Sequence, residues 1–153
     1  MAITSAICNS FKQEILVEGH NFTNGTDAFK LALYTSSATL SKSTTAYTAP
    51  ADGTADPTNT YEVSSPSTGY TPGGNALTST TPVLSGDTAC VKFADSSFGS
   101  ASFTARGFLI YNSTNSNKAV CAINFGADKT VTTGTFTIQF PAQTAGNAII
   151  QIA

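Results

Sequence analysis

Two apolar runs near the end of the chain constrain its fold more than any other feature. They cover residues 102–112 and 118–125, and both are rich in β-branched and aromatic residues. The segment between them, residues 113–117, contains only Ser, Thr and Asn, whose side chains bond to nearby backbone and favour turns. The pattern predicts a β-hairpin. Because the first run is apolar on both alternating faces, we expect it to be a central strand covered on both sides.

Further segments on both sides of this hairpin continue the β pattern. Residues 28–34 place Phe29, Leu31 and Leu33 on one face, which predicts a strand with one buried face. Other expected strands cover residues 75–80, 88–94, 131–140 and 147–152. Seven or eight strands separated by turns predict an all-β fold, mainly an antiparallel β-sandwich and jelly-roll-like. With 153 residues, the chain is expected to form a single β-sandwich domain over residues 1–153.

One short amphipathic helix is predicted ahead of the first strand, within residues 4–18. Its apolar residues recur with the i, i+4 and i+8 spacing of one helix face. They are Ile7, Phe11 and Ile15, with Cys8 and Leu16 beside them. Thr4 or Ser5 is expected to cap the start of the helix, and Gly19 is expected to end it in a left-handed conformation.

A long polar segment, residues 36–69, separates the first predicted strand from the rest. It is rich in Ser, Thr, Ala and Pro and shows no sustained periodicity. Loops of this length are uncommon in compact domains and are usually functional or ordered by contacts outside themselves. We therefore predict that residues 36–69 form a long loop or contact arm. The bend that follows, residues 68–77, contains three glycines and a proline and is predicted to be a tight turn.

The composition indicates a surface suited to packing against neighbours. Charged residues make up 10% of the chain and the net charge is -2, so the sequence predicts no nucleic-acid binding and no membrane binding. A surface with few long charged side chains has little rotamer entropy to lose in a contact, which suits packing against neighbouring molecules. The three cysteines, Cys8, Cys90 and Cys121, have apolar neighbours and are expected to be buried free thiols in a protein that folds in a reducing cytoplasm.

The residues capable of chemistry do not combine into a predicted active site. His20 is the only histidine and is expected on the surface, just beyond the helix end. Asp87, Asp95 and Asp128 lie at strand ends beside small residues, where carboxylates accept backbone amides in turns. Two of these carboxylates could still converge on a sugar, as in a glycosidase. We predict no catalytic, cofactor-binding or metal-ligating residues.

Arg106 is the only arginine and lies inside the most apolar run. A buried guanidinium without a partner is costly, so this side chain needs a carboxylate or several carbonyls. Glu62 and Asp95 are the expected partners within the fold. The alternative is a partner across a subunit boundary.

Four segments, taken in order, resemble a family of small virion proteins of tailed bacteriophages. They are Asn-Ser-Phe-Lys-Gln-Glu-Ile at 9–15, Phe-Lys-Leu-Ala-Leu-Tyr-Thr-Ser-Ser at 29–37, Thr-Gly-Tyr-Thr-Pro-Gly-Gly at 68–74 and Thr-Ala-Arg-Gly-Phe-Leu-Ile-Tyr at 104–111. In the family, a short helix precedes a strand of the second type, and a polar loop, the glycine bend and a strand ending in Ile-Tyr follow. The resemblance spans most of the chain, but residues 36–66 have no counterpart in it.

This resemblance implies a non-enzymatic structural protein of the phage particle. By size and all-β character, it implies a capsid decoration or cement protein on the outer surface of the capsid. Such proteins are typically jelly-roll-like trimers that bridge major capsid proteins. The resemblance therefore makes the major capsid protein the expected partner and a homo-oligomer, with a trimer favoured, the expected assembly. A tail-associated or receptor-binding virion protein is the main alternative. A carbohydrate-binding module or carbohydrate-active enzyme is a further one.

Overall fold

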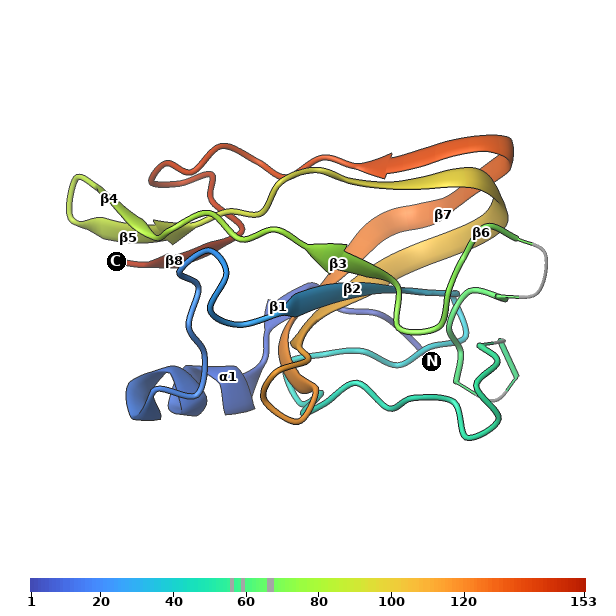
Figure 1. The fold of residues 1–153 in the computed structure, drawn as a ribbon, viewed down its shortest axis with the longest axis horizontal. Helices are drawn as coiled ribbons and strands as arrows, with labels where there is room; N and C mark the ends of the chain where they lie inside the picture. The colour runs from blue at the N-terminus through green and yellow to red at the C-terminus, as the bar shows by residue number, and fades with distance from the viewer. Residues whose placement is uncertain (56, 59, 66–67) are drawn as a thin grey trace.

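The computed structural model describes residues 1–55, 57–58, 60–65 and 68–153. They form two antiparallel sheets and one short N-terminal helix (Figure 1), which confirms the predicted mainly antiparallel all-β class. The five-stranded sheet has the order β1-β7-β6-β2-β3, and the three-stranded sheet has the order β4-β5-β8. This strand order does not establish the jelly-roll arrangement.

The elements have the following bounds. The strands are β1 (Ala6–Ile7), β2 (Phe29–Tyr34), β3 (Asn75–Leu77), β4 (Val83–Ser85), β5 (Thr88–Val91), β6 (Ser96–Asn112), β7 (Lys118–Ile138) and β8 (Ile150–Ile152). The helical part is α1 (Asn9–Glu14), which continues into a 3-10 turn, η1 (Ile15–Val17).

The predicted hairpin is confirmed, and it is longer than expected. β6 lies in the middle of the five-stranded sheet, and its residues 107–112 are all buried, as a central strand requires. The turn at 113–117 is closed by the Asn112 side chain, whose Oδ1 accepts the backbone N–H groups of Thr114 and Asn115. Residues 131–138, expected to begin a separate strand, are the continuation of β7.

The β6–β7 ribbon bends, so that its two halves lie in different layers of the molecule (Figure 1). The pairing register shifts on both sides of Ala101, and the neighbouring Ser100 and Thr133 have positive φ values of 50° and 47°. Such irregularities allow a strand to turn a corner. Inside the bend, Phe103 packs against Phe136 with ring centroids 5.3 Å apart.

The helix starts later than predicted because the preceding residues form β contacts. Ile3 forms a bridge with Leu40, and β1 pairs with β7. These backbone bonds hold residues 3–7 extended, so α1 begins at Asn9, after an N-cap at Cys8 without a side-chain capping bond. The expected caps, Thr4 and Ser5, were therefore wrong.

The predicted end of the helix also differs from the structure. The left-handed residue is Glu18, with φ of 57°, whereas Gly19 donates its backbone N–H to the carbonyl of Glu14. Leu16, expected beside the buried stripe, is 83% exposed. Ile15, Leu16 and Val17 are consecutive, and one helix face cannot bury three consecutive side chains.

Segment 36–69 lies along the large sheet, although residues 56, 59, 66 and 67 fall outside the described part. Its Leu40, Tyr47 and Val63 are buried, and Tyr47 stacks on Tyr111 with ring centroids 4.4 Å apart. This packing gives β2 a second covered side, so the expectation of one buried face on β2 was wrong. Whether the outward side of the segment contacts a partner stays a prediction.

The glycine bend is the predicted tight turn, and it packs directly against β2. The backbone N–H of Gly74 donates to the carbonyl of Thr71 across 2.8 Å. Gly74 has φ of +71°, and a Cβ at this position would lie 1.7 Å from the carbonyl oxygen of Leu31. Only glycine fits here without moving β2.

We expect Gly74→Ala to lower the free energy of unfolding by more than about 4 kcal/mol, because it adds a backbone clash to an unfavourable φ. Gly25→Ala is the matched control, since Gly25 has φ of +83° and no atom lies within 4 Å of the position that an added Cβ would take. The control should lose only about 1–2 kcal/mol. Denaturant titration of both variants measures the difference, and equal losses would contradict the packing argument.

Candidate functional site

Glu62 is the only buried acidic residue among those that the structure describes. Its side chain accepts hydrogen bonds from Tyr70 OH at 2.7 Å, the Gly73 N–H at 3.0 Å and Tyr47 OH at 3.1 Å. Glu62 is 0% exposed, and it forms no ion pair within the described part of the chain. Three hydrogen-bond donors therefore take the place of a cation.

The tyrosines around Glu62 are held in their protonated form. Burial, and then the charge of Glu62, raise the pKa of Tyr47, Tyr70 and Tyr111 above its ordinary value. The Tyr70 oxygen also accepts the backbone N–H of Leu33 at 3.1 Å. The cluster thus ties segment 36–69 and the glycine bend to β2.

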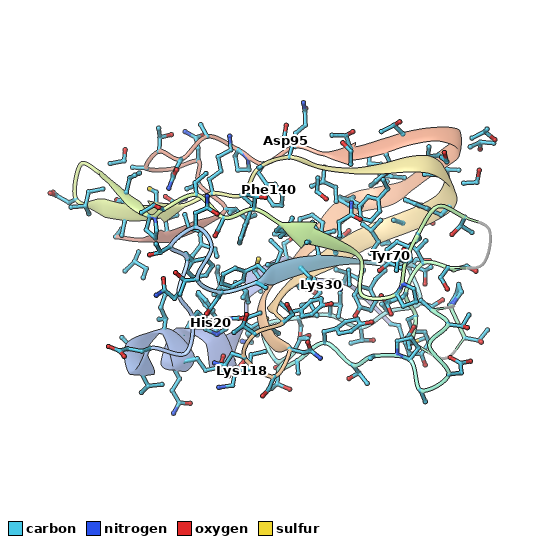
Figure 2. The ribbon with its side chains drawn as sticks, in the orientation of Figure 1. His20, Lys30, Tyr70, Asp95, Lys118 and Phe140 are labelled. Carbon is cyan, nitrogen blue, oxygen red and sulfur yellow. The ribbon has the colours of Figure 1, made fainter. Side chains whose placement is uncertain are left out.

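His20 is buried, so its expected surface position was wrong. The chain after α1 turns back into the core, and the imidazole packs on Phe11 with ring centroids 4.9 Å apart. Its Nε2 lies 2.8 Å from Glu14 Oε2. Lys118 Nζ lies 3.6 Å from the other oxygen of Glu14, on the same side of the molecule as His20 (Figure 2).

The hydrogen bonds of Asn112 determine the tautomer of His20. Asn112 Oδ1 accepts two backbone N–H groups, which identifies the other end of the side-chain amide as its NH2 group. An amide NH2 group can only donate hydrogen bonds. One hydrogen goes to Asp27 Oδ2 at 2.7 Å and the other to His20 Nδ1 at 3.2 Å. His20 Nδ1 is therefore an acceptor, and Nε2–H donates to Glu14. Through its two ring nitrogens, His20 links α1 to the hairpin turn, which is a structural role.

Arg106 pairs with Asp128, so both expected internal partners, Glu62 and Asp95, were wrong. Arg106 Nη1 lies 3.0 Å from Asp128 Oδ1, with the two side chains 34% and 47% exposed. Arg106 shares the outward side of β6 with Thr104, before the stretch that is buried on both faces. An ion pair this exposed contributes about 0–1 kcal/mol.

The other two aspartates that were expected at strand ends, Asp87 and Asp95, lie in a turn and just before a strand. Asp95 accepts the backbone N–H of Phe140 at 2.9 Å, as expected of a carboxylate in this position (Figure 2). Asp87 is exposed in the β4–β5 turn. Within the described residues, no group of three or more His, Cys, Asp or Glu side chains is placed to hold a metal ion.

All three cysteines are buried and free, as their apolar neighbours predicted. Burial is the main cause that raises the pKa of Cys8 to about 11, and it raises the pKa of Cys121 further. Both thiols are therefore protonated at neutral pH and poor nucleophiles. No helix in the described chain is long and apolar enough to cross a membrane.

One end of the molecule carries exposed apolar side chains that the sequence interpretation missed. They are Leu16, Val17, Val83, Leu84 and Ile152. They belong to α1–η1 and to the three-stranded sheet, which lie at the same end in Figure 1. A cleft of about 650 Å³ and a groove of about 290 Å³ lie between these elements. The signal in the sequence was the consecutive Ile15-Leu16-Val17, too many apolar residues for one helix face.

Comparisons with protein-family models, with curated proteins and with solved structures found no match to this chain.

We expect Glu62→Ala to lower the free energy of unfolding by about 3–5 kcal/mol, because it leaves buried donors unpaired. Arg106→Ala should change it by less than about 1 kcal/mol. Glu62→Gln should lie between them, since its amide oxygen can keep two of the donors. Denaturant titration ranks the three variants, and a loss for Arg106→Ala as large as for Glu62→Ala would contradict this assignment.

We also expect stability to fall as the pH rises above about 10. Burial raises the pKa of Tyr47 and Tyr111 in the folded state, so the native chain binds more protons than the unfolded chain above that pH. Unfolding monitored by circular dichroism should therefore accompany tyrosine ionisation measured by ultraviolet absorbance. Tyr47→Phe should flatten the pH dependence by removing one of these ionisations. Full tyrosine ionisation near pH 10 with the fold intact would contradict the prediction.

Proposed function

We propose that this chain is a non-enzymatic phage virion structural protein, a capsid decoration or cement protein that bridges major capsid proteins on the outer surface of the head. The observation that carries the proposal is the spatial relation of the segments that resemble phage virion proteins. β2 pairs with β6 along its whole length, from Phe29–Asn112 to Tyr34–Gly107. These two strands contain most of the second and fourth segments.

The glycine bend, the third of those segments, packs on the same two strands. Tyr70 accepts a hydrogen bond from the Leu33 backbone, and Tyr111 OH donates to the Gly73 carbonyl at 2.9 Å. Three stretches that are distant in sequence thus form one packed unit. The fold gives a physical reason for these three stretches to occur together in one sequence. This packing supports the resemblance to the phage virion proteins.

The proposed mechanism is mechanical. A protein that contacts several shell subunits adds buried interface at each junction, and linked contacts raise the cost of separating the subunits. Interfaces of roughly 800 Å² per partner are sufficient for stable attachment. Contacts of this kind suit a surface with few charged side chains to order or desolvate.

The outward side of segment 36–69 is the proposed attachment surface. Ser43, Thr48 and Ala51 are exposed there, while Leu40 and Tyr47 point into the core. Removing the whole segment would therefore uncover core residues. Attachment has to be tested by changing its outward side chains alone.

We expect Ser43→Glu, Thr48→Glu and Ala51→Glu, combined in one protein, to abolish decoration of phage heads without lowering the melting temperature. Charges at exposed sites leave the core intact but are costly to desolvate in a contact. The measurement is electron microscopy of heads incubated with labelled protein.

The matched control places the same three charges on β7, with Ala127→Glu, Thr132→Glu and Thr135→Glu, all at exposed positions. This control should still decorate heads. Equal decoration by both triple variants would remove segment 36–69 as the attachment surface. Unmodified protein found only on tails would contradict the capsid proposal and favour a tail-associated role.

A further inference from the structure

The three-stranded sheet carries an apolar row that the body of the protein covers only in part. Leu84 of β4 lies opposite Ala89 of β5, which lies opposite Ile152 of β8. Residues in register across neighbouring strands point to the same face. Leu84 is 76% exposed and Ile152 is 55% exposed, so the outer part of this face is open to solvent.

β8 has a free edge that borders an apolar groove. It pairs with β5 on one side and ends the strand order of its sheet on the other. The groove of about 290 Å³ lies between β8 and α1. Its walls are Ile7, Phe11, Lys12, Ile15, Leu16 and the three residues of β8. A free strand edge beside an apolar wall is a template for adding another strand.

β4 provides a second free edge at the other side of the same sheet. It pairs only with β5 among the described strands, and it carries the exposed Leu84. The two edges differ, because one presents a projecting apolar side chain and the other an apolar groove. Unlike surfaces that fit each other produce head-to-tail association between identical chains.

The charges beside the two edges are also complementary. Lys12 lies on the groove wall, and Asp87 lies in the turn that directly follows β4. Both side chains are exposed, and neither forms an ion pair within the described ranges. A contact that brings β4 to the groove could therefore pair the Asp87 carboxylate with the Lys12 ammonium group. This complementarity favours a second copy of the chain as the occupant.

We infer that β4 of one copy docks on the free edge of β8 in the next copy, with Leu84 in the groove and Asp87 beside Lys12. The contact is head-to-tail, so repeating it closes a ring or extends a filament. The inference goes beyond the proposed function and assigns the expected self-association of the chain to specific residues. It does not depend on attachment to a capsid.

Sedimentation velocity of the purified chain across micromolar concentrations tests this inference. The unmodified protein should sediment as a multiple of 15.7 kDa. Leu84→Asp should raise the dissociation constant at least about 100-fold, because it replaces a buried apolar group by a charge. Thr135→Asp, the same charge at an exposed site on β7, should leave the mass unchanged. Circular dichroism checks that each variant is folded.

Charge reversal gives a second test that does not alter the apolar contact. Asp87→Lys and Lys12→Glu should each weaken association about tenfold, and combining them should restore it. Recovery in the double variant supports a direct contact between the two positions. Failure of the double variant to recover would overturn the proposed pairing.

A monomer at all concentrations, or an unchanged mass for Leu84→Asp, would also overturn the inference. These outcomes differ from a failure of the capsid proposal. A protein that associates through these residues but does not decorate heads contradicts the capsid function and leaves the self-association surface in place.

Discussion

The buried carboxylate of Glu62 is the constraint on which much of the fold depends. An ionised group in the interior needs compensation, and here its donors come from Tyr47, Tyr70 and Gly73. These donors belong to stretches on either side of Glu62 that form no long strands of their own. Displacing either stretch would leave a buried charge short of partners. The requirement orders a long polar segment that its own propensities would leave loose.

A second polar network has the same effect at the helix end of the molecule. His20, Asn112, Glu14 and Asp27 connect α1, the loop after it and the hairpin turn. Every polar atom of the His20 ring and the Asn112 amide has a defined partner. Fully satisfied buried networks specify one arrangement, whereas apolar packing alone tolerates several. The two networks therefore fix the irregular parts, while the β6–β7 ribbon supplies the regular ones.

The regular parts of the fold could be predicted from the sequence because their information is local. The alternation of apolar residues and the turn-forming residues were sufficient to predict the β6–β7 hairpin, the strand β2 and the glycine bend. Strand pairing of residues 3–7 could not be predicted, because the partners Leu40 and β7 are distant in sequence and outweigh helix propensity. The expected site of Arg106 was wrong for a different reason. Its neighbours suggested burial, but the period of two places it beside the exposed Thr104.

The exposed apolar side chains at the end formed by α1–η1 and the three-stranded sheet were missed for a similar reason, because they too depend on how distant parts of the chain are arranged. Patterns in sequence show which residues are apolar, but only the strand order shows which edges and faces lack a cover. β4 and β8 lie at opposite edges of a small sheet, so neither can satisfy its outer backbone groups within its own sheet. An isolated monomer leaves those edges and Leu84 in water. Association between copies would remove this exposure. The hydroxyl-rich side of segment 36–69 would then be left for contacts of a different, more polar kind.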